Sequence, residues 1–148
     1  MTWKPHLTVA AIIEQNNKFL MVEERIQNKL CLNQPAGHLE PDETIVDAVK
    51  RETLEETAWL FEPSHVTGIY HWCNPSNNTT FIRFSFSGVA LHHDPDRMLD
   101  DGIEQAVWLT LDEIKSRQDA HRSPMVLSSI IDYLAGQRYP LDVLKVVG

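Results

Sequence analysis

Three glutamates in one short segment are the residues of this sequence best suited to chemistry. Glu52, Glu55 and Glu56 share one face if the segment is a helix, because each residue advances by about 100°. Ile45 and Val49, one or two turns earlier, point the same way, so the carboxylates continue the stripe that should face the protein. Hard divalent cations such as Mg²⁺ prefer carboxylate oxygens. The spacing therefore suggests a metal site with positions left open for a ligand.

A solvated acidic face is the alternative interpretation of the same residues. Glu52 and Glu56 form a like-charge i,i+4 pair, which destabilises a helix by a few tenths of a kcal/mol. No Lys or Arg follows four residues beyond any of the three glutamates, and Arg51 reaches Glu55 only in the less favourable orientation. Glutamates near the end of a helix also oppose its dipole. The residues alone leave the metal site and the solvated face about equally favoured.

Composition narrows the possible functions. The chain has 148 residues, 43% of them hydrophobic and 23% charged, as in an ordinary globular domain. A net charge of −8 argues against binding to nucleic acid or to a membrane surface but allows a small phosphorylated ligand. Cys31 and Cys73 lack metal-site spacing, and the first residues lack the apolar stretch of a signal peptide. A cytoplasmic location is therefore expected.

The elements that must position the glutamates follow from hydrophobic periodicity and turn residues. Strands are predicted at residues 6–13, 18–23, 29–32, 66–73, 79–91 and 105–109, and helices at about 44–57, 111–116 and 125–135. Thr44, followed three residues later by Asp47, resembles a capping box at the start of the acidic helix. No linker or repeat divides the chain, so residues 1–148 are expected to form one mixed α/β or α+β domain.

The glutamates also belong to a longer pattern that resembles a known family. Gly37-x5-Glu43-x7-Arg51-Glu52-x2-Glu55-Glu56 is similar to the Nudix box, the signature of hydrolases that act on nucleoside diphosphates linked to other moieties. The resemblance implies an α/β/α sandwich with a mixed sheet and a catalytic loop-helix. Where the family pattern has Gly, this chain has Ala58, which is strained in a left-handed conformation. The helix is therefore expected to end differently or to run on toward Pro63.

Segments outside the box resemble one branch of that family, the NudJ-type phosphatases. They include residues 33–40, 81–84, 122–124 and 136–141, and the resemblance spans nearly the whole chain. It implies release of inorganic phosphate from nucleoside di- and triphosphates. It also implies action on thiamine diphosphate and on its hydroxymethylpyrimidine diphosphate precursor.

The resemblance assigns roles to the box residues. Glu52 and Glu56 are implied as ligands of Mg²⁺, for which Mn²⁺ can substitute. Glu55 completes the site as a ligand or as a base that orients water, and the backbone carbonyl of Ala36 is a further ligand. The base itself is not assigned, because it varies within the family.

Three other box positions are implied to serve structure. Glu43 and Arg51 form an ion pair that ties the loop to the helix. Gly37 lets the backbone approach metal and phosphate closely.

Candidate substrate contacts lie outside the box. Arg83 alternates to the opposite face from Phe84 and is a candidate phosphate contact, although an edge-facing strand arginine is as well supported. Trp72 is a candidate for stacking on a substrate ring, against the commoner outcome of a core tryptophan. Arg25 and Lys29 are candidate phosphate contacts in a polar connection. Glu104 fits a surface acid better than an extra metal ligand.

Two other functions remain open at this stage. Pro75 stands near the spacing of a proline found in ADP-ribose pyrophosphatases, so hydrolysis of ADP-ribose or another nucleoside-diphosphate sugar is an alternative, although turns select proline anyway. A Nudix-fold ligand sensor is the non-enzymatic alternative, but such domains often lose the box glutamates that this chain retains. The expected partner is a small phosphorylated substrate, and the chain is expected to be a monomer or a homodimer.

Overall fold

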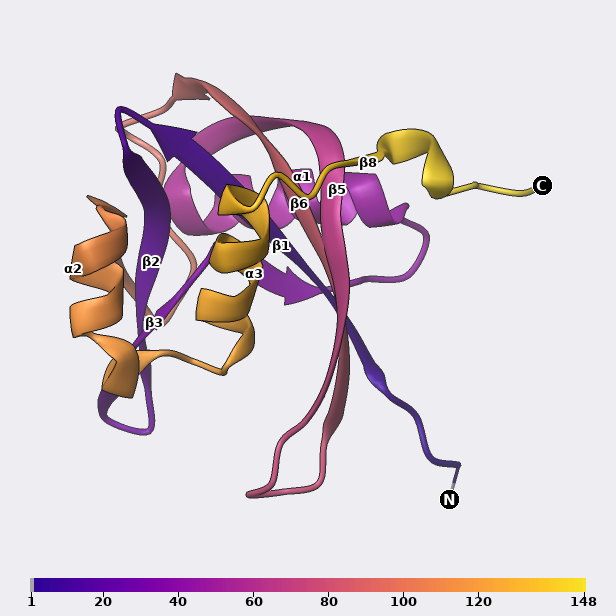
Figure 1. Ribbon diagram of the computed structural model, residues 1–148, viewed down its shortest axis with the longest axis horizontal. Coiled ribbons are helices and arrows are strands. Elements are labelled where there is room, and N and C mark those ends of the chain that lie inside the picture. Colours follow the sequence, from indigo (N-terminus) through magenta and orange to yellow (C-terminus); the bar gives the residue numbers. More distant parts are fainter. Residues whose placement is uncertain (1) are drawn as a thin grey trace.

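Eight strands form one mixed sheet in the computed structural model, which describes residues 2–148 (Figure 1). The strands are β1 (His6–Gln15), β2 (Lys18–Ile26), β3 (Lys29–Asn33), β4 (Ala36–His38), β5 (Trp59–Cys73), β6 (Thr80–His93), β7 (Ile103–Leu109) and β8 (Tyr139–Pro140). The helices are α1 (Ile45–Thr57), α2 (Leu111–Ser116) and α3 (Met125–Leu134), with short 3₁₀ turns at Gln118–Ala120 and Leu141–Val143. No helix in residues 2–148 is both long and apolar enough to cross a membrane.

β1 organises the sheet because it has partners of both senses. It runs parallel to β6 from His6 opposite Phe81 to Ile13 opposite Gly88. It is antiparallel to β2 at one end and to β4 at the other, where Thr8 lies opposite His38. The same Thr8 faces Arg83 across the parallel pairing. β1 thereby lies between β4, the last strand before α1, and the part of β6 that carries Arg83.

The two faces of β1 are buried against different helices. Val9, Ala11 and Ile13 join a core with residues of α1, β5 and β6. Ile12 belongs to a second core with residues of β2, β3, α2 and α3. Burial on both faces explains the continuous apolar run of β1. The resulting layers, with α1 on one side of the sheet and α2 and α3 on the other, confirm the predicted α/β/α sandwich (Figure 1).

The predicted start of β5 at residue 66 is wrong. The strand begins at Trp59, directly after α1, and runs through Pro63. The register between β5 and β6 shifts between Pro63 and His65, so the proline sits at an irregularity in the ladder, where a missing N–H is tolerated. Gly88 lies opposite Pro63, and a Cβ there would stand 2.1 Å from the carbonyl oxygen of Glu62. Glycine on the partner strand makes this proline compatible with pairing.

The expectation that α1 ends differently or runs on toward Pro63 is also wrong. Ala58 adopts the left-handed conformation, with φ 62° and ψ 18°, and its N–H donates to the carbonyl of Leu54 at 2.9 Å. The helix accepts a penalty of about 1 kcal/mol at this residue and ends where a glycine would end it. At the other end, the Thr44 hydroxyl accepts from the N–H of Asp47, which is one of the two hydrogen bonds of the predicted capping box.

Candidate active site

The glutamates of α1 lie on its inward side. Glu52 and Glu56 are only 9% and 8% exposed, and Glu55 is half-buried nearer the surface. The same face of the helix carries Ala48 and Val49, which are fully buried in the core. The continuation of the apolar stripe into carboxylates, inferred from the spacing, is confirmed. The solvated acidic face does not describe Glu52 and Glu56.

Arg51 neutralises part of this charge. Its Nε and Nη2 donate to the two carboxylate oxygens of Glu43 at 3.0 and 2.8 Å, the paired geometry expected of a tie between loop and helix. Its Nη1 donates to Glu52 at 2.8 Å and to Glu55 at 2.9 Å. The hydrogen bond from Arg51 holds the pKa of Glu43 below its usual value. Arg51 therefore pairs with both Glu52 and Glu55, although the order of Arg51 and Glu55 along the helix was expected to disfavour their pairing.

Glu56 has no such partner among residues 2–148. Its Oε1 accepts a hydrogen bond from the backbone N–H of Ala36 at 2.9 Å. Burial raises the pKa of Glu56 to about 9, and the nearby charges of Glu52 and Glu24 add to the rise. Burial likewise raises the pKa of Glu52 to about 7, although Arg51 opposes it. Buried carboxylates that repel one another are an arrangement which a bound divalent cation stabilises.

Gly37 is required by its contact with Glu52. A Cβ at residue 37 would lie 2.1 to 2.4 Å from the carboxyl atoms of Glu52. The glycine conformation is not left-handed, so the constraint is space and not backbone strain. The box glycine thus lets the Glu52 carboxylate lie directly against β4, a short strand that was not among the predicted strands.

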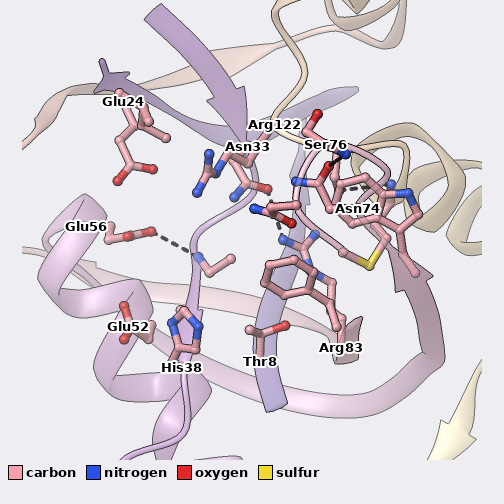
Figure 2. Close-up of a pocket in the computed structure, with 18 of the residues that line it drawn as sticks. Thr8, Glu24, Asn33, His38, Glu52, Glu56, Asn74, Ser76, Arg83 and Arg122 are labelled. Atoms are coloured by element: carbon pink, nitrogen blue, oxygen red, sulfur yellow. Dashed lines mark hydrogen bonds between the residues drawn. The ribbon is translucent and has the colours of Figure 1, made fainter. Parts of the chain in front are cut away.

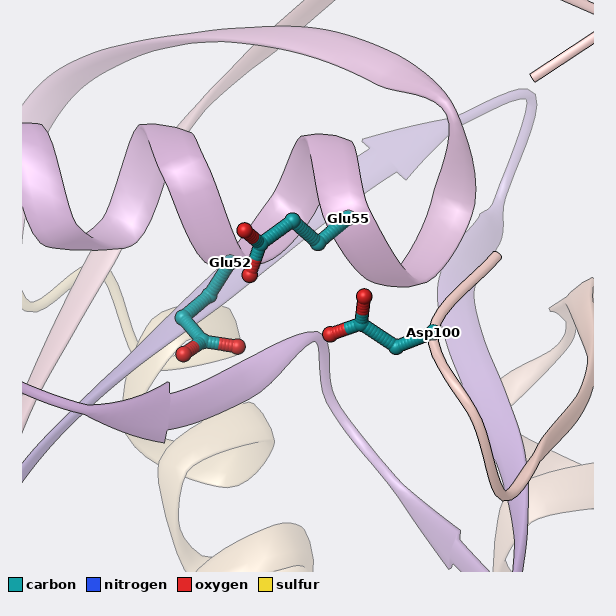
Figure 3. A group of neighbouring side chains, drawn as sticks. All are labelled: Glu52, Glu55 and Asp100. Atoms are coloured by element: carbon teal, nitrogen blue, oxygen red, sulfur yellow. The ribbon is translucent and has the colours of Figure 1, made fainter. Parts of the chain in front are cut away.

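Asp100 joins the glutamates from a distant loop. One carboxylate oxygen each from Glu52, Glu55 and Asp100 lie within 4.8 Å of one another (Figure 3). The N–H of Asp100 donates to the carbonyl of Glu55 at 3.0 Å, which fixes the loop to the end of α1. An octahedral Mg²⁺ places opposite ligands about 4.2 Å apart, so an all-oxygen set of this spacing fits such an ion. Asp100 was not predicted, because nothing in a polar loop sequence indicates which helix it will contact.

A cavity of about 730 Å³ opens beside Glu52 and Glu56. Figure 2 shows the carboxylates of Glu24, Glu52 and Glu56 at one side of it, with Asn74 and Ser76 at the other. Ala36 and Gly37 also line it. Its volume suits a nucleotide-sized ligand.

Arg83 lies in the floor of this cavity and is only 4% exposed. It comes from β6, which lies between β1 and β5, so the edge-facing alternative does not apply. Nη1 donates to the side-chain oxygen of Gln34 and Nη2 to that of Asn33, both at 3.2 Å. Its Nε has no partner in the described part of the chain. Burial lowers the pKa of Arg83 to about 10.

Trp72 is half-buried and lines the cavity, so it is not a core residue. Its ring stacks on Phe81 with centroids 5.7 Å apart and an interplanar angle of 21°. Arg25 and Lys29 are not among the described residues that line the cavity. Arg25 is instead paired with Glu104 at 2.8 Å on the exposed side of β2 and β7.

The structure adds lining residues that the sequence did not single out as a site. They include Glu24, Asn33, His38 and Arg122. Asn33 and His38 flank the predicted Ala36 and Gly37, so their proximity in sequence was the available signal. Arg122 follows a 3₁₀ turn. It belongs to one of the segments that resemble the NudJ-type branch, but that resemblance did not indicate that its side chain lines the cavity.

Comparisons with known proteins agree with this architecture. The family model of the NUDIX domain matches residues 4–128. Phosphatase NudJ of Escherichia coli (strain K12) is 42% identical over 142 residues, which cover 96% of this chain and 92% of that protein. The solved structure of a NUDIX hydrolase from Nitrosomonas europaea is 54% identical, with a TM-score of 0.96, and the match covers 97% of this chain and 98% of that one.

A more distant structure shares the fold alone. A bifunctional NMN adenylyltransferase/ADP ribose pyrophosphatase from Francisella tularensis, complexed with AMP and a Mn ion, is 24% identical with a TM-score of 0.71. The match covers 90% of this chain and 42% of that one. The extent of the family match and the identity to a phosphatase over nearly the whole chain show that this protein belongs to the Nudix family of hydrolases, which act on phosphoanhydrides.

Proposed function

We propose that this protein is a Mg²⁺-dependent Nudix hydrolase that releases the terminal phosphate of nucleoside di- and triphosphates and of thiamine-related diphosphates. The observation that carries the proposal is the buried pair Glu52 and Glu56 at one end of a cavity whose floor holds Arg83. The similarity to a protein named as a phosphatase supports orthophosphate as the product. The substrate is a small phosphorylated molecule.

The metal ligands in this proposal come from α1 and β4. Glu52, Glu55 and Glu56 would hold Mg²⁺, or Mn²⁺ in its place, together with the backbone carbonyl of Ala36. A bound ion would polarise the phosphoryl oxygens and lower the pKa of a water molecule that attacks phosphorus. Asp100 lies close enough to Glu52 and Glu55 to share in binding.

The remaining residues place these carboxylates and the substrate. Arg51 holds Glu52 and Glu55 side by side, and its tie to Glu43 fixes the loop before α1. A glutamate of the α1 set orients the attacking water. Arg83 contacts a phosphate, and Trp72 stacks on the ring of the substrate.

The structure does not favour the ADP-ribose alternative. Pro75 is exposed at the β5–β6 turn, and it is its neighbours Asn74, Ser76 and Asn77 that line the cavity. The relative with ADP ribose pyrophosphatase in its name is too distant to carry its activity over.

The test is phosphorus NMR of the products after incubation with Mg²⁺. GDP, ADP-ribose and hydroxymethylpyrimidine diphosphate are supplied separately, and Glu56→Gln controls for contaminating phosphatase. Inorganic phosphate from GDP or from the pyrimidine diphosphate, absent in the variant, is the expected result. AMP and ribose phosphate from ADP-ribose would favour the sugar-nucleotide alternative. Turnover of none of the three would contradict the proposal, and Mg²⁺-dependent binding without turnover would favour the ligand sensor.

A further inference from the structure

The Arg83 guanidinium is a buried cation that forms no ion pair with any carboxylate in residues 2–148, although the charge of Glu56 acts on it from a distance. Both of its hydrogen bonds go to neutral side-chain amides, those of Gln34 and Asn33, and each is 3.2 Å long. Its Nε is among the few buried polar side-chain atoms in residues 2–148 that have no partner. A buried charge is normally paired, because removing it from water is costly. The cavity above Arg83 is the place from which a pairing anion can come.

Arg122 supplies a second cation to the same cavity. Its side chain lines the cavity, and it forms no ion pair with any carboxylate of the described chain. Its backbone is fixed, because its N–H donates to the carbonyl of Leu32 at 2.8 Å. Arg122 lines the cavity together with Glu24 and His38. Its charge opposes the rise that burial causes in the pKa of Glu24, and it adds to the lowering of the pKa of His38 by burial and by His6.

The two guanidinium groups approach the cavity from different elements. Arg83 rises from β6 in the floor, and Arg122 reaches in from the loop before α3. Figure 2 shows both between the carboxylates of Glu52 and Glu56 on one side and the Asn74–Ser76 turn on the other. Glutamates alone would repel a phosphate chain, so two unpaired arginines next to them form a distinct anion-binding region.

We propose that Arg83 and Arg122, the arginine pair, bind the phosphate chain of the substrate from two sides and fix its direction in the cavity. The phosphate to be released faces Glu52 and Glu56, and the organic part points to the wall formed by Trp72 and Phe81. This inference rests on the proposed function, because it takes a phosphorylated substrate as the ligand. It assigns Arg122 a role in substrate binding that neither the family pattern nor the box residues supply.

The test uses pyrophosphate as the probe and the full chain in EDTA, so that binding is measured without metal and without turnover. Proton–nitrogen NMR follows the Nε–H groups of the arginines during the titration. The resonances of Arg83 and Arg122 are expected to shift together and to saturate, while that of the exposed Arg97 stays in place. No saturable shift at either member of the pair would overturn the proposal.

Variants sharpen the same experiment. Arg122→Gln is expected to weaken pyrophosphate binding by about tenfold or more, because a charge-assisted hydrogen bond is lost. Arg97→Gln removes an equal charge outside the cavity and is expected to change binding less than twofold. If the two substitutions weaken pyrophosphate binding equally, the change in net charge alone explains the loss, and the role of Arg122 is overturned. Arg83→Lys keeps the buried charge and is expected to bind pyrophosphate more weakly while unfolding at an unchanged temperature.

Binding and hydrolysis can fail separately. Pyrophosphate binding at the arginine pair with no phosphate release from any substrate would contradict the proposed function and leave the anion site standing. Phosphate release whose kcat and KM are both unchanged by Arg122→Gln would contradict the role of Arg122 and leave the proposed function standing.

Discussion

The two ends of the cavity are built in different ways. The carboxylate end, Glu52 and Glu56 with Glu55 beside Glu52, comes from two turns of one helix. The remaining lining, which we call the substrate wall, includes Asn33, Trp72, Arg83 and Arg122 from β3, β5, β6 and the loop before α3. One helix determines the spacing of the carboxylates, whereas the substrate wall exists only after four separate segments meet. The carboxylate end is therefore suited to a constant chemistry, and the substrate wall to the choice of ligand.

The largest expected effect comes from Glu56→Gln at the carboxylate end. Phosphate release should fall by about three orders of magnitude, because a metal ion contributes several kcal/mol of transition-state stabilisation. With a pKa of about 9, Glu56 is mostly protonated near neutral pH without metal. The amide of the variant is also neutral and still accepts the hydrogen bond from Ala36, so the unfolding temperature in EDTA should not decrease. Glu62→Gln on the exposed side of β5 is the matched control, with activity within about twofold. Retained activity in Glu56→Gln would remove this residue from the site.

A methyl group at residue 37 tests the positioning of the carboxylate end. Gly37→Ala should displace the Glu52 carboxylate and lower kcat by about a hundredfold, since a misplacement of about 1 Å can have that effect. Gly136→Ala is the contrasting variant, because Gly136 has φ +89° and open space around the added methyl group. It should lower the unfolding free energy by about 1 kcal/mol without changing kcat. If Gly37→Ala, like Gly136→Ala, lowers only the unfolding free energy and leaves kcat unchanged, then Gly37 does not position the Glu52 carboxylate for catalysis.

Mg²⁺ binding should distinguish the two ends without turnover. At a concentration of about 100 Kd, the ion stabilises the folded state by about 2.7 kcal/mol, or about 5–10 °C for a domain of this size. Thermal unfolding with and without EDTA measures the shift. Glu56→Gln should abolish it, and Trp72→Leu in the substrate wall should retain it. A shift of equal size in Glu56→Gln would place the ion elsewhere.

The substrate wall should affect KM more than kcat. Trp72→Leu is expected to raise KM for GDP by about tenfold, the size of a lost stacking contact, with kcat within about twofold. Tripolyphosphate has no ring, so its KM should not change. Trp3→Leu is the control, because Trp3 is 70% exposed. An equal rise in KM for both substrates would show that Trp72 supports the fold of the wall and does not stack on a ring.

The smallest expected effect is at the end of α1. Ala58→Gly should stabilise the protein by about 1 kcal/mol, because glycine has no Cβ penalty in the left-handed conformation seen here. Differential scanning calorimetry should show a rise of about 2–4 °C with unchanged phosphate release. A lower unfolding temperature would show that the Cβ of Ala58 does not strain the left-handed conformation.

Local patterns predicted the parts of the molecule that local forces determine. The inward face of α1 follows from helical periodicity, and the alternation that turns Arg83 away from Phe84 follows from strand periodicity. The cap at Thr44 follows from the residue types at positions 44 and 47. The strand was predicted to start only after Pro63, because the compatibility of this proline with β5 depends on Gly88 in the partner strand. The end of α1 was predicted wrongly because a local preference was given too much weight. Pairing of β5, which follows directly, outweighs the penalty of about 1 kcal/mol for the left-handed conformation at Ala58.

The site residues divide in the same way. Glu52 and Glu56 were found by spacing, and their burial agrees with it. Asp100 and Arg122 were missed, because a loop sequence does not indicate where in space the loop ends. Arg25 was predicted as a candidate phosphate contact, but it pairs with Glu104 on β7, and only the sheet register reveals this pairing.

The parallel pairing of β1 with β6 has a consequence for the order of folding. β1 is synthesised before β6, so its pairing cannot be completed until Phe81 and the residues after it are available, and such long-range closures slow folding. Until then, the apolar run of Val9 to Ile13 lacks its main partner and is exposed to aggregation. A nascent chain that ends before Phe81 carries every glutamate of α1 but no Arg83. Ligand binding therefore begins with closure of the sheet, so a substrate mimic can serve as a reporter of late folding.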